Sequence, residues 1–281
     1  MSLSSKSIKQ YDNVYGIIQK GFDGAVNYDD TEKVMNIISY KENGKVVSDW
    51  TLKNRLSAVM HKSSNPVYKE KMIEVSGRLK EVSNKPETYE AKEQDFSYED
   101  LKNAYERAKG YEKMILSLYY LMPPRRLNDY IDMIVRTEKP KRLSNSTNYL
   151  IVDGDNHYFV FNNYKTKHIY KRQTIAIPDA VWELVKDHIK DKQLFLTNPT
   201  SKAKFTDAQF SDYLRRLTMT LVGKKGSATA FRHAYITNFL KSNPTTLQRY
   251  KMAELMAHSV GTQLSYDRRM PKPEMKEEEA D

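Results

Sequence analysis

One stretch of the chain changes its hydrophobic period, and this stretch constrains the fold more than any other feature. Over residues 148–177, three runs rich in β-branched and aromatic residues are separated by GDN and by KTKHIYK. Such runs between turn signals predict strands. Elsewhere apolar residues recur at helical spacing. We therefore expect a mostly helical α+β protein with one small, three-stranded antiparallel sheet.

The helical segments before and after this stretch suggest two domains, a natural number for 281 residues. The helices expected before the sheet span residues 6–20, 29–41, 49–62, 66–82, 97–109, 111–122 and 125–136. Those expected after it span residues 178–190, 206–222, 228–241 and 244–257. Residues 85–95 contain a proline, several charges and no large aliphatic side chain, which predicts a linker. We expect an all-helical domain over 1–84 and a mixed domain over 96–270.

Helix starts in the second domain have recognisable caps. Ser97 is followed by Asp100, and Thr206 by Gln209, at the spacing of a capping box. Asn243, just before a proline, is expected to cap the last predicted helix.

The charge balance favours a polyanionic partner. The net charge is +10, and the acidic tail, residues 271–281, masks a larger excess. Five acids and one lysine over residues 274–281 contribute −4, so the rest of the chain carries +14. Such an excess favours binding to nucleic acid, although a basic surface also serves solubility.

Several classes of protein are excluded by composition. The chain has no cysteine, so disulfides, thiolate zinc sites and cysteine nucleophiles are excluded. No run approaches the roughly 18 apolar residues of a membrane span, and the N-terminus lacks the apolar stretch of a secretion signal. We expect no membrane partner, and an intracellular protein of the cytoplasm or nucleus of a host cell.

Five polar residues between positions 126 and 266 are candidates for the cleavage of a phosphodiester. They are Arg126 in PPRRLNDY, Lys165 in NNYKTKH, Arg232 in TAFRHAY, His258 in LMAHSVG, and Tyr266. Attack on a phosphodiester adds negative charge to the non-bridging oxygens, and fixed guanidinium groups stabilise that charge. An ammonium can protonate the departing oxygen, and cations favour attack by a phenol.

Two of these assignments have a competitor. Arg125 competes with Arg126, although Asp129 lies three residues after Arg126, where its carboxylate would share a face of the predicted helix and fix the orientation of the Arg126 guanidinium. Lys165 lies on the turn after the second predicted strand, where Lys167 is the alternative acid. Arg125 and Lys167 are in either case expected to contact DNA.

Metal catalysis fits less well. The sequence has no P-loop, no H-E-x-x-H and no cysteine-based site, and its six histidines are dispersed. The aspartates available are Asp129, Asp132, Asp153 and Asp155, which lie beside arginines or in a turn. We expect neither a metal ion nor a cofactor.

Further basic residues are candidates for DNA recognition. Lys53, Asn54 and Arg55 form a polar face on the predicted helix 49–62, which suits a reading helix and equally a solvated face. The candidates for backbone contacts in the second domain are Lys202, Lys204, Arg215, Arg216, Lys224 and Lys225.

The order Arg, Lys, Arg-His, His, Tyr resembles that of the tyrosine recombinase (integrase) family. The motifs PPRR, YKT, FRH and AHS are similar to those of family members encoded by large DNA viruses and virophages of protists. The resemblance covers residues 95–266 by motif and 1–83 by general character. It implies that two domains clamp duplex DNA and that a tyrosine forms a 3′-phosphotyrosyl link, which a 5′ hydroxyl later reverses. It assigns Arg126, Lys165, Arg232 and His258 to the site and Tyr266 as nucleophile.

Two departures from the family pattern concern this site. Thr229 stands three residues before Arg232, where the family usually has histidine. A hydroxyl can donate to a phosphate oxygen but cannot hold a proton as an imidazolium does. His233 is turned by about 100° from Arg232 on a helix, so it is not assigned that role. The stretch from His258 to Tyr266 is also one residue shorter than the commoner spacing.

The resemblance implies a site-specific recombinase or integrase acting on double-stranded DNA. It would cleave one strand per protomer in a homo-tetramer on DNA, and a monomer is possible without DNA. The rivals are a type IB topoisomerase-like enzyme, which relaxes supercoils as a monomer, and a DNA-binding regulator that has lost catalysis. The acidic tail would dock on a neighbouring protomer or be disordered.

Overall fold

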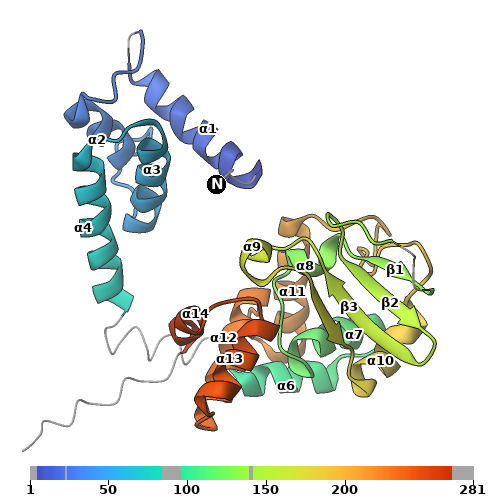
Figure 1. Cartoon of the computed structure of the whole chain (residues 1–281). Helices are drawn as coiled ribbons and strands as arrows, with labels where there is room; N and C mark the ends of the chain where they lie inside the picture. Colours follow the sequence, from blue (N-terminus) through green and yellow to red (C-terminus); the bar gives the residue numbers. More distant parts are fainter. Residues whose placement is uncertain (1–4, 23, 84–95, 139–141, 268–281) are drawn as a thin grey trace, which may run out of the picture. The chain divides into compact units, whose positions relative to one another are not determined.

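A computed structural model describes residues 5–22, 24–83, 96–138 and 142–267. The chain divides into two compact units, Met1–Tyr89 and Glu90–Asp281 (Figure 1). Each has a hydrophobic core of its own. The predicted linker and the acidic tail lie outside the described residues. None of the described helices combines the length and the apolar character that a membrane span requires.

The first unit contains the four helices that apolar spacing predicted. They are α1 (Ser5–Lys20), α2 (Thr31–Ser39), α3 (Asp49–Lys62) and α4 (Pro66–Ser83). The helix α3 packs against the other three, and residues such as Ile18, Val34, Leu56 and Val75 are fully buried between them. An ion pair from Arg78 on α4 to Asp49, with Nη2 and Oδ1 2.6 Å apart, fixes the start of α3.

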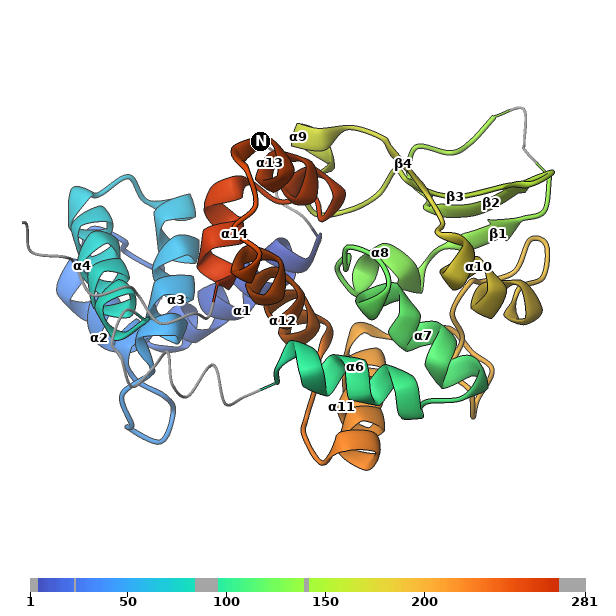
Figure 2. The same cartoon turned by 90° about the horizontal axis from the view of Figure 1, so that it is seen from below.

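The second unit is mostly helical. Its helices are α6 (Tyr98–Arg107), α7 (Gly110–Tyr120), α8 (Asn128–Ile131), α9 (Lys167–Tyr170), α10 (Asp179–Val185), the 3₁₀ helix η1 (Lys186–His188), α11 (Asp207–Val222), α12 (Ala228–Lys241), α13 (Thr246–Leu255) and α14 (Val260–Tyr266). The core helix α7 packs on α6, α10 and α12. The sheet lies at one end of the unit and α12, α13 and α14 at the other (Figure 2).

The prediction of a three-stranded antiparallel sheet is wrong, because the sheet has four strands. They are β1 (Ile134–Arg136), β2 (Tyr149–Asp153), β3 (Asn156–Phe161) and β4 (Gln173–Ala176), in the order β1-β2-β3-β4. The three predicted strands are present and antiparallel, and Gly154 at φ 59 makes the tight turn between β2 and β3. The additional strand β1 pairs with β2 in parallel.

The strand β1 replaces part of the helix predicted over 125–136. Only the short helix α8 forms there, because the chain then pairs with distant partners. The N–H of Val135 donates to the carbonyl of Gln193, and the N–H of Phe195 donates to that of Met133, both at 2.8 Å. Apolar residues continue at helical spacing through this segment, so periodicity alone could not separate the two structures.

Two of the three predicted helix caps are present and the third is not. The predicted capping boxes of Ser97 and Thr206 are present at α6 and α11. Asn243 was expected to cap α13 but has φ 50, and Thr245 provides the cap with Gln248. An asparagine tolerates this left-handed conformation, which follows the end of α12.

Candidate functional site

Three arginine side chains of the second unit meet at the carboxyl end of α13. Three consecutive carbonyls accept a hydrogen bond from one guanidinium each: Leu255 from Arg125 at 3.0 Å, Met256 from Arg232 at 3.3 Å, and Ala257 from Arg126 at 3.0 Å. Carbonyls at a helix end lack intrahelical partners and carry partial negative charge, which suits cationic donors. The helix end therefore holds three guanidinium groups in one small region.

Asp129 orients Arg125, and the prediction that it orients Arg126 is wrong. Nε of Arg125 lies 2.9 Å from Oδ2 of Asp129, and both side chains are buried. Nη1 of Arg125 also donates to Gln173 at 2.6 Å. Residues 125 and 126 precede α8 in a segment without regular structure, so the helical spacing on which the prediction relied is absent. Arg125 is therefore part of the core, whereas Arg126 stays partly exposed.

Arg232 on α12 is only 2% exposed and is held from three sides. Its Nη1 donates to the carbonyl of Pro124, and its Nη2 lies 3.1 Å from Nδ1 of His258. Burial lowers the pKa of Arg232, and the neighbouring Tyr266 opposes this by raising it. Arginine remains charged in proteins, so the group is a fixed cation at this position.

His258 is a neutral imidazole with a defined tautomer. A guanidinium can only donate, so Nδ1 accepts from Arg232 and Nε2 carries the proton. Burial, reinforced by the charges of Arg232, Arg126 and Arg125, lowers the pKa of His258 to about 3. Its Nε2 is buried and has no hydrogen-bond partner among the described residues. This N–H can donate to an oxygen of a bound anion.

Tyr266 packs into this cluster from α14. Ser259 caps this helix, and Tyr266 is its last residue. The Tyr266 ring centroid lies 5.3 Å from Cζ of Arg232 and 5.4 Å from the His258 ring. The structure thus brings Arg126, Arg232, His258 and Tyr266 to one place, although Arg126 is more than 100 residues from the other three in the sequence.

His233 also belongs to this cluster, although the sequence pattern assigned it no role. Its ring meets that of Tyr266 edge-on at 4.6 Å, and its Nδ1 donates to the Tyr266 carbonyl at 3.0 Å. Thr237, one turn later on α12, donates to the same carbonyl at 3.4 Å. The spacing of four residues between His233 and Thr237, which places both on one helix face, was the available signal.

The Lys165 turn reaches the same helix end. Lys165 is exposed on the turn after β3, and the hydroxyl of Thr166 donates to the carbonyl of Ala257 at 2.8 Å. Lys167 instead directs its ammonium to Asn163 Oδ1 at 3.3 Å. Thr229 is exposed one turn before Arg232, and its hydroxyl has no hydrogen-bond partner among the described residues.

The candidate reading helix α3 is only partly turned outward. Lys53 and Asn54 are partly exposed. Arg55 instead donates from Nη1 to the carbonyls of Ile38 and Tyr40, at 3.0 and 2.8 Å. It therefore stabilises the carboxyl end of α2 rather than presenting its guanidinium to a partner.

Most of the basic residues expected to follow a DNA backbone have acidic neighbours. Lys204 pairs with Asp132, Lys224 pairs with Asp100, and Arg215 and Arg216 pair with Asp212. Lys202 and Lys225 are exposed and have no ion pair in the described part of the chain.

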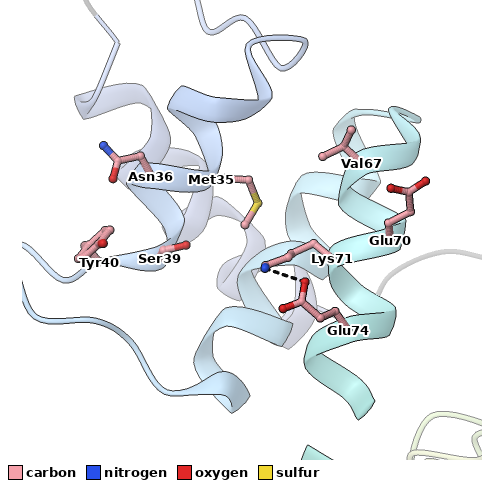
Figure 3. Close-up of a pocket in the computed structure, with 8 residues that line it drawn as sticks. All are labelled: Met35, Asn36, Ser39, Tyr40, Val67, Glu70, Lys71 and Glu74. Carbon is pink, nitrogen blue, oxygen red and sulfur yellow. Dashed lines mark hydrogen bonds and ion pairs between the residues drawn. The ribbon is translucent and has the colours of Figure 1, made fainter. Parts of the chain in front are cut away.

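A groove in the first unit is a poor site for phosphate. It lies between α2 and α4, and its lining includes Met35, Tyr40 and Val67 (Figure 3). Its charged lining consists of Glu70, Glu74 and Lys71, and Lys71 pairs with Glu74 at 2.7 Å. The excess of carboxylates would repel a polyanion.

The described residues contain no group of three histidine, aspartate or glutamate side chains placed to hold a metal ion. The four aspartates that were candidate metal ligands have different surroundings. Asp129 pairs with Arg125 and Asp132 with Lys204, while Asp153 and Asp155 lie at the turn between β2 and β3.

No family model matches the sequence, and no curated protein matches it. The fold, however, is similar to that of the Tn1549 transposon integrase, solved in complex with transposon right-end DNA. That match has a TM-score of 0.57 and 11% identity, and covers 94% of this chain and 90% of that one. XerA recombinase has 13% identity and a TM-score of 0.43, over 94% of this chain and 87% of that one. The chain therefore has the fold of the Tn1549 integrase.

Proposed function

We propose that the protein is a site-specific DNA recombinase that cleaves and rejoins double-stranded DNA through a 3′-phosphotyrosyl intermediate on Tyr266. One observation carries the proposal: the Tyr266 ring packs against Arg232 and His258 beside Arg126, at the carboxyl end of α13. The Tn1549 integrase, which shares the fold, was solved with transposon DNA, and this supports DNA as the substrate class.

In the proposed reaction the phenol oxygen of Tyr266 attacks a backbone phosphorus. The bond from phosphorus to the tyrosine oxygen forms, and the bond to the 5′ oxygen breaks. The phenol proton passes to water, and the departing 5′ oxygen takes a proton from Lys165. A 5′ hydroxyl reverses these steps on the same or another strand. No energy source is needed, because the phosphotyrosyl bond conserves the energy of the cleaved bond.

The remaining residues stabilise the charge that develops on the phosphate. Arg126 and Arg232 donate N–H groups to the non-bridging oxygens, as preorganised cations do in other phosphoryl transfers. His258 donates from Nε2, because its neutral tautomer leaves that N–H unpartnered. The Thr229 hydroxyl, on the first turn of α12, is a further donor in place of an imidazole. Three guanidinium groups against the single carboxylate of Asp129 give the site a net positive charge.

We further propose that residues 1–84 form the core-binding domain and residues 96–270 the catalytic domain. We expect contacts to the DNA backbone from the partly exposed Lys53 and from the exposed Lys202 and Lys225, which would give a marked salt dependence. Paired sites would be joined by a homo-tetramer in the cytoplasm or nucleus of a host cell. Neither a metal ion nor a cofactor takes part in the steps above.

A nicked suicide substrate tests the proposal. The short fragment that carries the 5′ hydroxyl diffuses away after cleavage, so the strand cannot be rejoined and the covalent intermediate accumulates. We expect a denaturant-resistant adduct between protein and DNA that is lost in Tyr266→Phe. An adduct that persists in Tyr266→Phe would reassign the nucleophile. A mobility shift without any adduct across a library of DNA sites would support a regulator. Relaxation of plasmid by monomeric protein, without exchange between two sites, would support a topoisomerase.

A further inference from the structure

The carbonyl of Ala257 joins two parts of the proposed site. It accepts a hydrogen bond from Nη1 of Arg126 at 3.0 Å and another from the hydroxyl of Thr166 at 2.8 Å. A carbonyl oxygen has two lone pairs, so these two donors saturate it. Ala257 lies in the left-handed region at φ 51, immediately before His258. Its conformation therefore sets the position of this carbonyl as well as that of His258.

Thr166 is the residue after Lys165, and its hydroxyl ties their turn to α13. The strand side of the turn is fixed independently, because the side chain of Asn148 accepts from the N–H groups of Asn162 and Asn163, at 2.8 and 2.7 Å. On the other side, the Thr166 hydroxyl bonds the end of α13, and the Tyr164 ring lies over the Arg125 guanidinium, with its centroid 4.7 Å from Cζ. Without the hydroxyl, the turn would keep its attachment to the sheet and the contact of Tyr164, and would lose the hydrogen bond that joins it to Ala257.

The two lysines of this turn, Lys165 and Lys167, differ in their hydrogen bonds. The ammonium of Lys167 donates to Asn163, whereas Lys165 is exposed and has no partner among the described residues. A long, unpaired side chain samples many positions, so its reach is governed by the backbone that carries it. The hydrogen bond of Thr166 holds this backbone to Ala257, which is next to His258 in the sequence.

We propose that Thr166 is a positioning residue that holds the Lys165 turn against the carboxyl end of α13, so that the Lys165 ammonium reaches the 5′ oxygen of the phosphate bound by Arg126 and His258. This inference rests on the proposed function. Thr166 itself does not touch the reacting atoms and acts through Lys165.

The test compares two suicide substrates, one with the ordinary bridging 5′ oxygen and one with sulfur in its place. A thiol has a pKa of about 8.5, so a thiolate leaves without a proton donor. We expect Thr166→Val to slow adduct formation about 10-fold on the oxygen substrate, a part of the roughly 100- to 10,000-fold effect of general acids. On the sulfur substrate its rate should equal that of the wild type.

Three variants serve as controls. Thr166→Ser keeps the hydroxyl and should retain the wild-type rate on both substrates. Thr174→Val makes the same exchange at an exposed position of β4 and should also have no effect. Lys165→Ala should show the larger defect on oxygen and recover on sulfur. Thermal melting of each variant confirms that it is folded.

The outcomes separate the inference from the function beneath it. If Thr166→Val matches the wild type on the oxygen substrate, or is slowed equally on oxygen and sulfur, Thr166 does not position the acid. In both cases the adduct still forms, so the proposed function stands. If the wild type forms no adduct with either substrate, the proposed function and the inference fail together.

Discussion

Nη2 of Arg232 lies 3.1 Å from Nδ1 of His258, and this contact fixes the imidazole as neutral, with its proton on Nε2. Because burial and the nearby guanidinium groups disfavour the imidazolium, the pKa of His258 falls from 6.5 to about 3. The pair therefore converts a titratable side chain into a hydrogen-bond donor that keeps its proton across the physiological range.

This pKa predicts how stability depends on pH. Below pH 6.5 the unfolded chain binds a proton at His258, whereas the folded protein leaves this side chain neutral. The free energy of unfolding therefore falls as pH decreases from 6.5 towards 3. The slope from this group is at most about 1.4 kcal/mol per pH unit. Urea unfolding at pH 7, 6 and 5 should show a smaller loss of stability in His258→Gln than in the wild type. Parallel curves for the two proteins would contradict the assignment.

Substitution of Arg125 should mainly reduce stability, whereas substitution of Arg126 should mainly reduce activity. Arg125→Met leaves the buried carboxylate of Asp129 without its partner, and we expect a loss of about 3–5 kcal/mol in the free energy of unfolding. Arg126→Gln removes a partly exposed guanidinium, so stability should change by less than about 1 kcal/mol, while adduct formation falls at least about 100-fold. Denaturant unfolding and the suicide-substrate assay measure both effects. Equal losses of stability would mean that Arg126 is also structural.

Gln263, on the helix that carries Tyr266, should be replaceable with a gain in stability. Its side chain is fully buried, and neither amide atom has a hydrogen-bond partner among the described residues. Gln263→Met keeps the length and removes an unsatisfied polar group, so we expect stabilisation by about 1 kcal/mol. Gln263→Ala opens a cavity instead and should destabilise. A marked loss of stability in Gln263→Met, read from thermal unfolding, would show that the amide is bonded, for example through water.

Chelation should leave the reaction unchanged. The proposed steps use Arg126, Arg232 and His258 to stabilise negative charge and Lys165 to supply a proton. Adduct formation after dialysis against EDTA should therefore match that of untreated protein. A loss of activity that Mg²⁺ or Mn²⁺ restores would require a metal in the mechanism, even with Tyr266 as nucleophile.

Local patterns in the sequence were sufficient for most helices and for three of the four strands. Capping boxes at Ser97 and Thr206 and the alternation within 148–177 depend on neighbouring residues alone, and the structure confirms them. The strand β1 was missed because it has three residues and exists through pairing with β2 and with the segment around Gln193. No local signal distinguishes such a strand from the end of a helix.

The sequence by itself determined which chemical groups the protein has and in which order: two arginines, a lysine, a histidine and a tyrosine. Only the tertiary structure decided that Arg125 is buried with Asp129 while Arg126 stays partly exposed, and that His233 joins Tyr266. The physical reason is that these choices depend on distant carbonyls: those of Leu255 and Ala257, more than 100 residues from the two arginines, and that of Tyr266 for His233. Composition and spacing carry no information about which side chain meets those carbonyls until the chain has folded.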